Sequence, residues 1–470
     1  MRTVLLATLI LSCSTSAYGV SLGATSAHRR LTRELVMALD SVLAHERAGG
    51  GWTFASAAGT RPAPNTVPLK IAERLAAPLG LARWDLVVLR SPGTPAAGLA
   101  LLGGYRASGR ADYLAAAERA GDLLVAIQMP SGGWFSEMPV EGRALAPWFA
   151  WAVRRTAVDD DVTPGATRFL LALWEATGER RYRDSAVRAV AFLVRAQLPD
   201  GAWPLVWRPG WKRVLWPTFE DLPTLNDGAT TQTIETLLVA GRTLGRADLV
   251  VAARRGGEWL LRARRSPPQA GWAQQYDADG VPAPARRFEP AALASWESRH
   301  AIDALLALAA STGDRRYCAP VEDAVRWLAG SAVHPGCWAR FYALGTNAPL
   351  YVTSDGRHVD GPRAARSGYD WTGDFGIPAL FARLGLDGDG NFYPTAALAR
   401  RVLARGRAAP AERAPGDPGT CRNDHAAHTD FHMPDDARVL IAHAATLLAA
   451  LEPAAPSPCV ATIQAPEAGQ

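Results

Sequence analysis

The stretch Ser108-Gly109-Arg110-Ala111-Asp112-Tyr113 decides the fold, because close copies of it return at a regular interval along the chain. In each copy a glycine follows a small or aliphatic residue, and polar residues then lead to an aromatic or aliphatic side chain. The other copies are Thr177-Gly178-Glu179-Arg180-Arg181-Tyr182, Leu244-Gly245-Arg246-Ala247-Asp248-Leu249, Thr312-Gly313-Asp314-Arg315-Arg316-Tyr317 and a degenerate Leu384-Gly385. The interval is about 68 residues, and self-similarity at a fixed period indicates a repeat architecture.

Stretches with helical spacing of apolar residues flank the turns. They lie at 96–105, 166–176, 230–240 and 301–310 before a turn, and at 114–128, 186–197, 250–262 and 321–329 after one. Glycine commonly follows a helix end, because it adopts the left-handed conformation without strain. Each unit is therefore predicted to be a helix, a glycine turn, a second helix and a long loop, and strand-like alternation is nearly absent.

The loops favour a closed ring over an open solenoid. They are long, aromatic and different from one another, as expected if they gather at one end and build a site. We therefore expect an all-α fold, an (α/α) toroid of about five helical hairpins whose long loops form a cleft at one end.

Tryptophans recur in the loops at nearly the same interval. Four of them follow a glycine by one or two positions, and Trp52 is an earlier member; the four are Trp134, Trp203, Trp272 and Trp338. They could stack on sugar rings or pin the loops to the helices, and the regular recurrence favours pinning. Better candidates for sugar platforms are the tryptophans that break the repeat, Trp148, Trp207, Trp211, Trp216 and Trp296.

The N-terminal residues are typical of an export signal. Arg2, an apolar stretch at 4–11 and small residues up to 19 predict a signal peptide over residues 1–19, or a lipoprotein signal ending at Cys13. We expect the toroid domain at 28–452, a disordered tail at 453–470, and a monomer that is secreted, periplasmic or lipid-anchored. The net charge of +5 includes only two lysines and no basic tail, which argues against a nucleic-acid partner.

Four cysteines remain downstream of the signal. In an oxidising compartment we expect the pairs Cys318–Cys337 and Cys421–Cys459, one of three possible pairings. A group near Cys421 could be a metal site, although its spacing matches no zinc pattern; it comprises Asp424, His425, His428, Asp430 and His432.

Acidic residues precede the first helices of three units. Asp159-Asp160-Asp161, Asp227 and Glu297 lie about one repeat apart, so we expect them to ring one mouth of the toroid. Acidic residues also cap helix starts, and this structural reading competes with a functional one.

From about residue 159 to 373 the chain resembles the family-ten pectate lyases, which are α/α-toroid polysaccharide lyases. The blocks that carry the resemblance occur in the family's order: Thr224-Leu225-Asn226-Asp227-Gly228-Ala229, Trp272-Ala273-Gln274-Gln275-Tyr276-Asp277, Pro284-Ala285-Arg286-Arg287-Phe288-Glu289-Pro290, Ala294-Ser295-Trp296-Glu297-Ser298 and Trp338-Ala339-Arg340-Phe341-Tyr342.

The resemblance implies calcium-assisted β-elimination on pectate or a related acidic polysaccharide, a polyuronate. It assigns Ca²⁺ to Asp227 and Asp277, and the base to Arg340 or Arg366. An arginine base requires neighbouring cations that lower its pKa. Substrate contacts are implied for Asn226, Trp272, Tyr276, Arg287 and Glu297.

Two departures from the family keep other functions open. Ala348 replaces an arginine in Thr346-Asn347-Ala348-Pro349, and the segment at 364–372 keeps Arg366 but lacks a glutamate and a second arginine. The alternatives are a catalytically impaired uronate-binding protein, and a toroidal glycoside hydrolase that uses Asp227 and Glu297 as acid and base.

Overall fold

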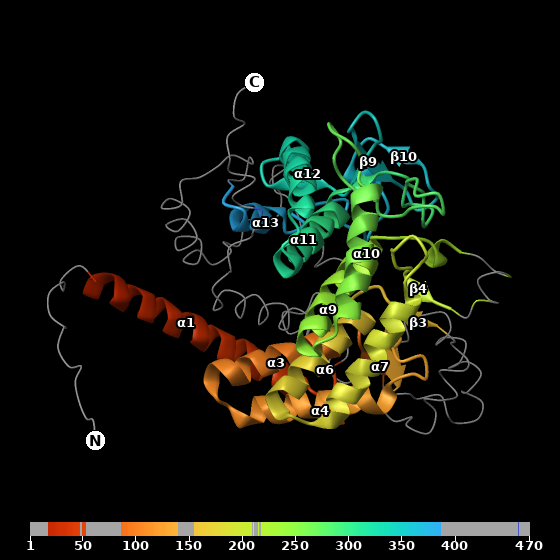
Figure 1. The fold of residues 1–470 in the computed structure, drawn as a ribbon. Helices are drawn as coiled ribbons and strands as arrows, with labels where there is room; N and C mark the ends of the chain where they lie inside the picture. The colour runs from red at the N-terminus through yellow and green to blue at the C-terminus, as the bar shows by residue number, and fades with distance from the viewer. Residues whose placement is uncertain are drawn as a thin grey trace, which may run out of the picture.

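The computed structural model describes residues 17–47, 49–52, 86–139, 155–208, 210, 215, 218–386 and 459. Pairs of consecutive helices dominate this part of the chain (Figure 1). The pairs are α3 (Thr94–Ser108) with α4 (Ala111–Ile127), α6 (Val162–Thr177) with α7 (Arg180–Ala196), α9 (Ala229–Thr243) with α10 (Ala247–Ala263), and α11 (Ser295–Thr312) with α12 (Cys318–Gly330). The predicted unit of two helices around a glycine turn is confirmed.

The repeated glycines end the first helix of a pair. Gly109, Gly178 and Gly313 adopt φ values of 72°, 73° and 69°, in the left-handed region. Their amides donate to carbonyl oxygens at the preceding helix ends, at 2.7, 2.7 and 2.9 Å. The degenerate copy behaves alike, because α13 (Ile377–Arg383) ends just before Gly385, whose φ is 77°.

The first helices of successive pairs pack against one another. Contacts join α3 to α6, α6 to α9 and α9 to α11, and α1 (Ala17–Ala44) packs against α3. The close approach of α3 and α6 needs Gly98, because a Cβ there would lie 2.3 Å from the Phe169 ring. This arrangement of inner and outer helices confirms the predicted (α/α) toroid class (Figure 1).

Short strands occur in the loops, although the sequence shows almost no strand-like alternation. They are β1 (Leu86–Val88), β2 (Glu137–Pro139), β3 (Thr156–Ala157), β4 (Val206–Trp207), β5 (Leu293–Ala294), β6 (Ala332–His334), β7 (Cys337–Ala339), β8 (Phe341–Tyr342), β9 (Pro349–Val352), β10 (His358–Val359) and β11 (Thr372–Gly373). All pairings are antiparallel, in the orders β1-β2, β3-β4, β10-β9-β8-β5 and β11-β7-β6. With two to four residues each, these strands are too short for the sequence to show alternation.

The repeated tryptophans pin the loops, as their recurrence predicts. Trp52, Trp134, Trp203, Trp272 and Trp338 are all at most 1% exposed. Their indole Nε1 atoms donate to main-chain carbonyls of the preceding helix, at 2.6–2.9 Å; the acceptors are Val42, Leu124, Leu193, Leu260 and Leu328. The tryptophans are therefore part of the core and do not face a ligand.

Four of these tryptophans also bind the next inner helix through their main-chain amides. The amides of Trp52, Trp134, Trp203 and Trp272 donate to hydroxyl groups near the starts of α3, α6, α9 and α11, at 2.9–3.2 Å. The acceptors are Thr94, Thr163, Thr230 and Ser298. Each tryptophan thus connects one helical pair to the next.

The disulfide prediction is wrong for both pairs. Cys318, at the start of α12, is bonded to Cys459, which is 141 residues later in the sequence. Cys337 is also disulfide-bonded. The bond from Cys318 joins α12 to the C-terminal part of the chain, a proximity that local spacing does not reveal.

Other predictions fall partly or wholly outside the described residues. These are the signal peptide and Cys13, the group at 424–432, the tail at 453–470, and Trp148, Trp211 and Trp216. Among the helices that the structure describes, none is both long and apolar enough to cross a membrane.

The inner helices carry ion pairs between residues of the same helix or its N-terminal cap. Arg168 of α6 forms an ion pair with Asp161 at 2.6 Å, and Arg299 of α11 pairs with Asp303 at 3.0 Å. Glu235 of α9 lies near these groups, and burial raises its pKa to about 7 from the ordinary 4.5. A carboxyl group whose pKa is raised by folding opposes folding when it is ionised.

We predict that Glu235→Gln stabilises the protein at pH 8 by about 1–2 kcal/mol and has little effect at pH 5. The folded state binds a proton that the unfolded state releases between about pH 4.5 and 7, so stability falls as pH rises through this window. Thermal unfolding at both pH values measures the difference. The matched control is Glu175→Gln, an exposed carboxyl group on α6; an equal gain for both variants at pH 8 would contradict the prediction.

We predict that Trp203→Phe lowers the free energy of unfolding by about 2 kcal/mol, because it leaves the Leu193 carbonyl without its indole donor and opens a small cavity. Chemical denaturation measures this. Trp207→Phe, on a partly buried tryptophan outside the repeat, is expected to cost less; similar losses would refute a special role for the repeated indole.

Candidate functional site

Three aspartates from two loops meet at the entrance to neighbouring inner helices. Asp159 and Asp160 precede α6, and Asp227 lies in the short helix η3 (Asn226–Gly228) before α9. One carboxylate oxygen of each lies within 4.8 Å of the others. The Asp160 amide also donates to the Asp227 carbonyl at 2.8 Å, which fixes the two loops relative to each other.

The aspartates hold an uncommon backbone conformation. Asp160 and Asp227 have φ values of 52° and 50°, and the adjacent Asp161 has 58°. Aspartate tolerates this left-handed region better than most residues, but it is still unfavourable for a residue with a side chain. The Ser91 amide donates to the Asp160 carbonyl at 2.8 Å and helps to hold the turn. Conformations of this kind concentrate at binding and catalytic sites.

The three carboxylates repel one another in a half-buried position. Burial and the nearby Asp160 and Asp227 raise the pKa of Asp159 well above its usual range. Burial, with Asp227, raises the pKa of Asp160 to about 7, and burial also raises the pKa of Asp227. A cation between these oxygens would relieve both the repulsion and the loss of solvation.

The donor atoms suit a hard cation. Asp159 Oδ1 is buried without a hydrogen-bond partner, and so are both side-chain amide atoms of Asn226. Asn226 is 1% exposed and directly precedes Asp227. Carboxylate and amide oxygens are the ligands that Ca²⁺ prefers, and a calcium site needs several of them. The residues present therefore fit a calcium ion, with Asp159, Asp160 and Asp227 as ligands. Asn226, the residue before Asp227, adds a side-chain oxygen that has no hydrogen-bond partner.

Asp277, the second predicted calcium ligand, is engaged elsewhere. Its Oδ1 accepts from the amides of Asp279 and Val281, at 3.0 and 2.9 Å. It is not in the group of converging carboxylates found among the described residues. The repeat spacing predicted that Asp159, Asp160 and Asp227 lie at one mouth of the toroid, but the family resemblance assigned the ion to Asp227 and Asp277.

Two cations border the aspartates. Arg286 forms an ion pair with the buried Glu289 at 2.7 Å, and its charge lowers the pKa of Asp227 in opposition to burial. Arg90 lies 3.7 Å from Glu137 and acts on Asp227 in the same direction. The family resemblance suggested Arg287, but Arg286 is the neighbour that acts on the acidic cluster. The side chain of Arg287 is exposed.

Arg340 lies in a buried ion pair. Its Nη2 donates to Glu297 Oε1 at 3.0 Å, and the two residues are 6% and 0% exposed. Burial by itself lowers the pKa of Arg340, but Tyr369, Glu297 and Asp227 outweigh it, so that the pKa is raised. These surroundings hold the guanidinium proton, whereas a base must release it. The structure therefore opposes the predicted role of Arg340 as the base.

Arg366, the other predicted base, has different surroundings. Its guanidinium carbon lies 3.9 Å from the centre of the Phe288 ring and 6.0 Å from that of Tyr369. No ion pair to a carboxylate of the described residues is found for it. Tyr369 connects this group to the acidic network, because its hydroxyl donates to Glu289 at 3.2 Å.

Three of the predicted substrate contacts are wholly buried. Trp272, Tyr276 and Glu297 are each 0% exposed. Tyr276 accepts from the Ala273 amide and donates to the Ala263 carbonyl, at 2.8 and 3.1 Å. These contacts give Trp272 and Tyr276 a structural role in their loop in place of the predicted contact with a sugar.

The position of the lost family arginine is solvent-exposed. Ala348 lies in the turn between β8 and β9, where its carbonyl accepts from the Ala343 amide at 2.8 Å.

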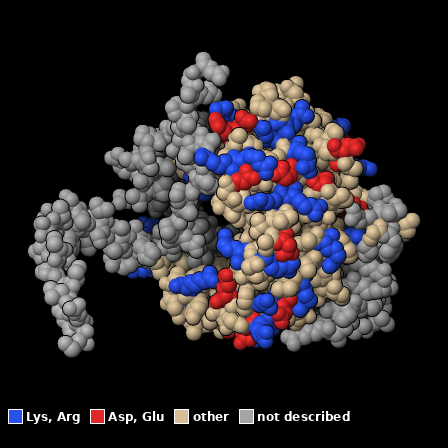
Figure 2. Space-filling view, viewed as in Figure 1, with Lys and Arg blue, Asp and Glu red and all other residues tan. Residues whose placement is uncertain are grey.

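Basic and acidic side chains are interspersed over the face of the molecule in Figure 2, so the net positive charge is not concentrated on that face.

Comparison with known proteins supports the family resemblance. Residues 141–336 match the family described as pectic acid lyase. This stretch, less than half of the chain, is similar to that family. The pectic acid lyase stretch includes the three clustered aspartates, Arg286 and the Glu297 side chain. No curated protein matches the chain in sequence.

Solved structures resemble the chain at low identity. The family 10 polysaccharide lyase from Cellvibrio cellulosa is 21% identical, with 61% of this chain and 95% of that chain covered and a TM-score of 0.47. Its D189A mutant in complex with trigalacturonic acid is 20% identical, with 62% and 97% covered and a TM-score of 0.46. An unsaturated glucuronyl hydrolase specific for heparin is 14% identical over 91% of this chain and 98% of that chain, with a TM-score of 0.50. The last likeness extends the shared fold over most of the chain.

We predict that Arg340→Met lowers the free energy of unfolding by about 3 kcal/mol at pH 8, because it leaves the Glu297 carboxylate buried without its partner. The double variant with Glu297→Met is expected to recover much of this loss. Denaturation of both single variants and the double variant forms the double-mutant cycle. Arg181→Met, in an exposed pair with Asp122, is the control and is expected to cost less than about 1 kcal/mol; additive effects at 297 and 340 would contradict a coupled pair.

Proposed function

We propose that this protein is a secreted polysaccharide lyase that cleaves pectate or a related polyuronate by β-elimination. The observation that carries the proposal is the convergence of Asp159, Asp160 and Asp227 within the stretch that matches the pectic acid lyases. A second support is Arg286, a cation beside these acids that suits the carboxylate of a uronate substrate.

The reaction removes the proton at C5 of a uronate and expels the glycosidic oxygen at C4. Negative charge develops next to the substrate carboxylate, so the site must supply positive charge there. Asp159, Asp160 and Asp227 would hold a calcium ion, which would bind the substrate carboxylate and neutralise that charge. The guanidinium groups of Arg286 and Arg90 would orient the same carboxylate.

Of the two predicted bases, we assign proton removal to Arg366. Arg340 is held in its charged form by Glu297, Asp227 and Tyr369, and in this assignment it contributes a fixed positive charge. Arg366 lies on an aromatic ring and forms no ion pair with a described carboxylate. A cation or a cationic side chain nearby would lower its pKa, as a base of this type requires.

The alternatives differ in their support. A glycoside hydrolase that uses Glu297 is disfavoured, because Glu297 is 0% exposed and paired with Arg340. A catalytically impaired uronate-binding protein is supported by Ala348, where the family has an arginine. The assay below distinguishes this alternative from the lyase.

We predict a rise in ultraviolet absorbance from an unsaturated uronate product when the protein meets polygalacturonate with calcium, and no rise with chelator. Asp159→Asn and Asp227→Asn are each expected to lower kcat/KM by at least about a hundredfold at low calcium, because each removes one charged ligand from the cluster. Asparagine keeps the size of aspartate and tolerates the same backbone conformation.

Two further variants make the assay specific. Asp277→Asn tests the predicted ligand pair against the observed cluster, and it is expected to leave the calcium concentration at half-maximal activity unchanged. Asp360→Asn, at an exposed position, is the control for loss of charge. Binding of polygalacturonate without product would support the impaired binding protein, and neither binding nor product would reject both.

A further inference from the structure

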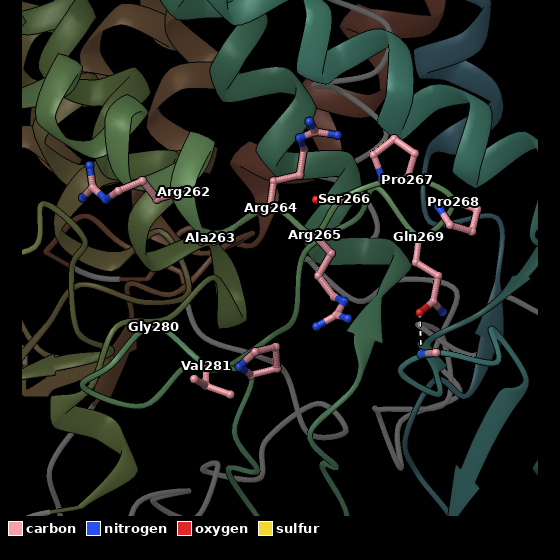
Figure 3. A pocket seen from close by; sticks show the side chains of 12 residues that line it. Arg262, Ala263, Arg264, Arg265, Ser266, Pro267, Pro268, Gln269, Gly280 and Val281 are labelled. Carbon is pink, nitrogen blue, oxygen red and sulfur yellow. Dashed lines mark hydrogen bonds between the residues drawn. The ribbon is translucent and has the colours of Figure 1, made fainter.

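The connection between α10 and α11 forms a cavity of about 520 Å³ that is open to solvent, because most of the residues that line it are exposed. Its lining comes from residues 262–269, from 280–282 and from Gly345 (Figure 3). This volume lies within the range of about 300–1,000 Å³ that is usual for small-molecule sites. None of the lining residues belongs to the aspartate cluster or to the Arg340 ion pair, so this cavity is a second feature of the loop region.

Hydrogen bonds fix two walls of the cavity. One wall is the turn at Val281, whose amide donates to Asp277 Oδ1 and whose carbonyl accepts from the Asp277 amide, both at 2.9 Å. The other wall is Gln269, which is 6% exposed. Its Nε2 donates to the Ala343 carbonyl at 2.9 Å, and its Oε1 accepts from the Gly345 amide at 2.5 Å. The cavity is thus formed before any ligand arrives, and Asp277 supports it.

Three arginines line the cavity, but only one points into it. Arg264 pairs with Asp323 at 3.0 Å, and Arg262 donates to the Asp200 carbonyl at 2.6 Å. Both of these side chains point away from the hollow in Figure 3. Arg265 is exposed and extends between Val281 and Gln269 (Figure 3). Among the described residues, no carboxylate forms an ion pair with it. The cavity therefore presents one positive charge that the surrounding described residues leave unbalanced.

We propose that this cavity is an accessory binding site for one acidic sugar of a polysaccharide, with its carboxylate on Arg265. A planar guanidinium matches the two oxygens of a carboxylate. The apolar faces of Pro267, Pro268, Val281 and Pro282 would pack against the sugar ring. The identity of the sugar as a uronate rests on the proposed function.

Such a site has a consequence that depends on substrate length. Under this proposal a long chain occupies the aspartate cluster and this cavity together, and two linked contacts bind more tightly than either one alone. A short oligosaccharide occupies one of them. Loss of Arg265 should therefore weaken binding of the polymer and leave turnover of a trisaccharide unchanged.

The test measures retention of the full chain in gels that contain polygalacturonate, in the Asp227→Asn background so that the polymer is not degraded. Adding Arg265→Ala is expected to raise the apparent Kd about tenfold, the effect of one lost charge-assisted hydrogen bond. Adding Arg180→Ala, which removes an exposed arginine at the start of α7, is the matched control and should change nothing. Neutral dextran should retain no variant, and thermal unfolding should show that both variants are folded.

The outcomes separate this site from the lyase itself. Equal retention of the Arg265→Ala variant and its parent, or equal losses at Arg265 and Arg180, would overturn the accessory site. Arg265-dependent retention on sulfated dextran but not on polygalacturonate would overturn the assignment to a uronate. Product formation is measured separately on the protein with Asp227 intact, so an inactive enzyme that still binds through Arg265 would reject the lyase and support the site.

Discussion

The structure depends on one repeated contact, the anchoring of a buried tryptophan to the helix that precedes it. The indole donates to a carbonyl near the end of one outer helix, and in four units the main-chain amide donates to a hydroxyl near the start of the next inner helix. Long loops carry many polar main-chain groups and would lose much entropy on ordering. The tryptophan offsets this by burying a large apolar ring and satisfying both hydrogen bonds. Each loop is thereby held between two helices at fixed points.

Fixed loops allow the chain to gather charges that repel one another. Asp159, Asp160 and Asp227 are brought together by loops whose ends are set at Trp134 and Trp203 and whose backbones are bonded to each other. The left-handed conformations of Asp160 and Asp227 show that local preference gives way to the surrounding packing. Carboxyl groups whose pKa values are raised in this way are typical of functional sites. A bound cation would stabilise their charged form, which is consistent with the proposed calcium-assisted reaction.

The arginines illustrate how surroundings assign different roles to one residue type. Arg340 is buried beside Glu297 and keeps its proton, Arg286 borders the acidic cluster, Arg366 lies on Phe288, and Arg265 faces the cavity between α10 and α11. A guanidinium can act as a base only where neighbouring cations lower its pKa, and its planar donor groups otherwise suit a carboxylate. The same reasoning separates the proposed reaction site from the proposed accessory site.

The sequence by itself determined the helical pairs, the glycine turns, the tryptophan anchors and the likeness to the pectic acid lyases, because these features follow from local spacing and repeat along the chain. It also identified Asp227, through the resemblance of the block at 224–229 to the family. Tertiary structure alone decided that Asp159 and Asp160, and not Asp277, accompany Asp227, that Arg340 is held by Glu297, and that Cys318 bonds to Cys459. These contacts join residues from different units. The pKa values and exposed fractions of these side chains depend on which loops pack together, and no local sequence pattern encodes that packing.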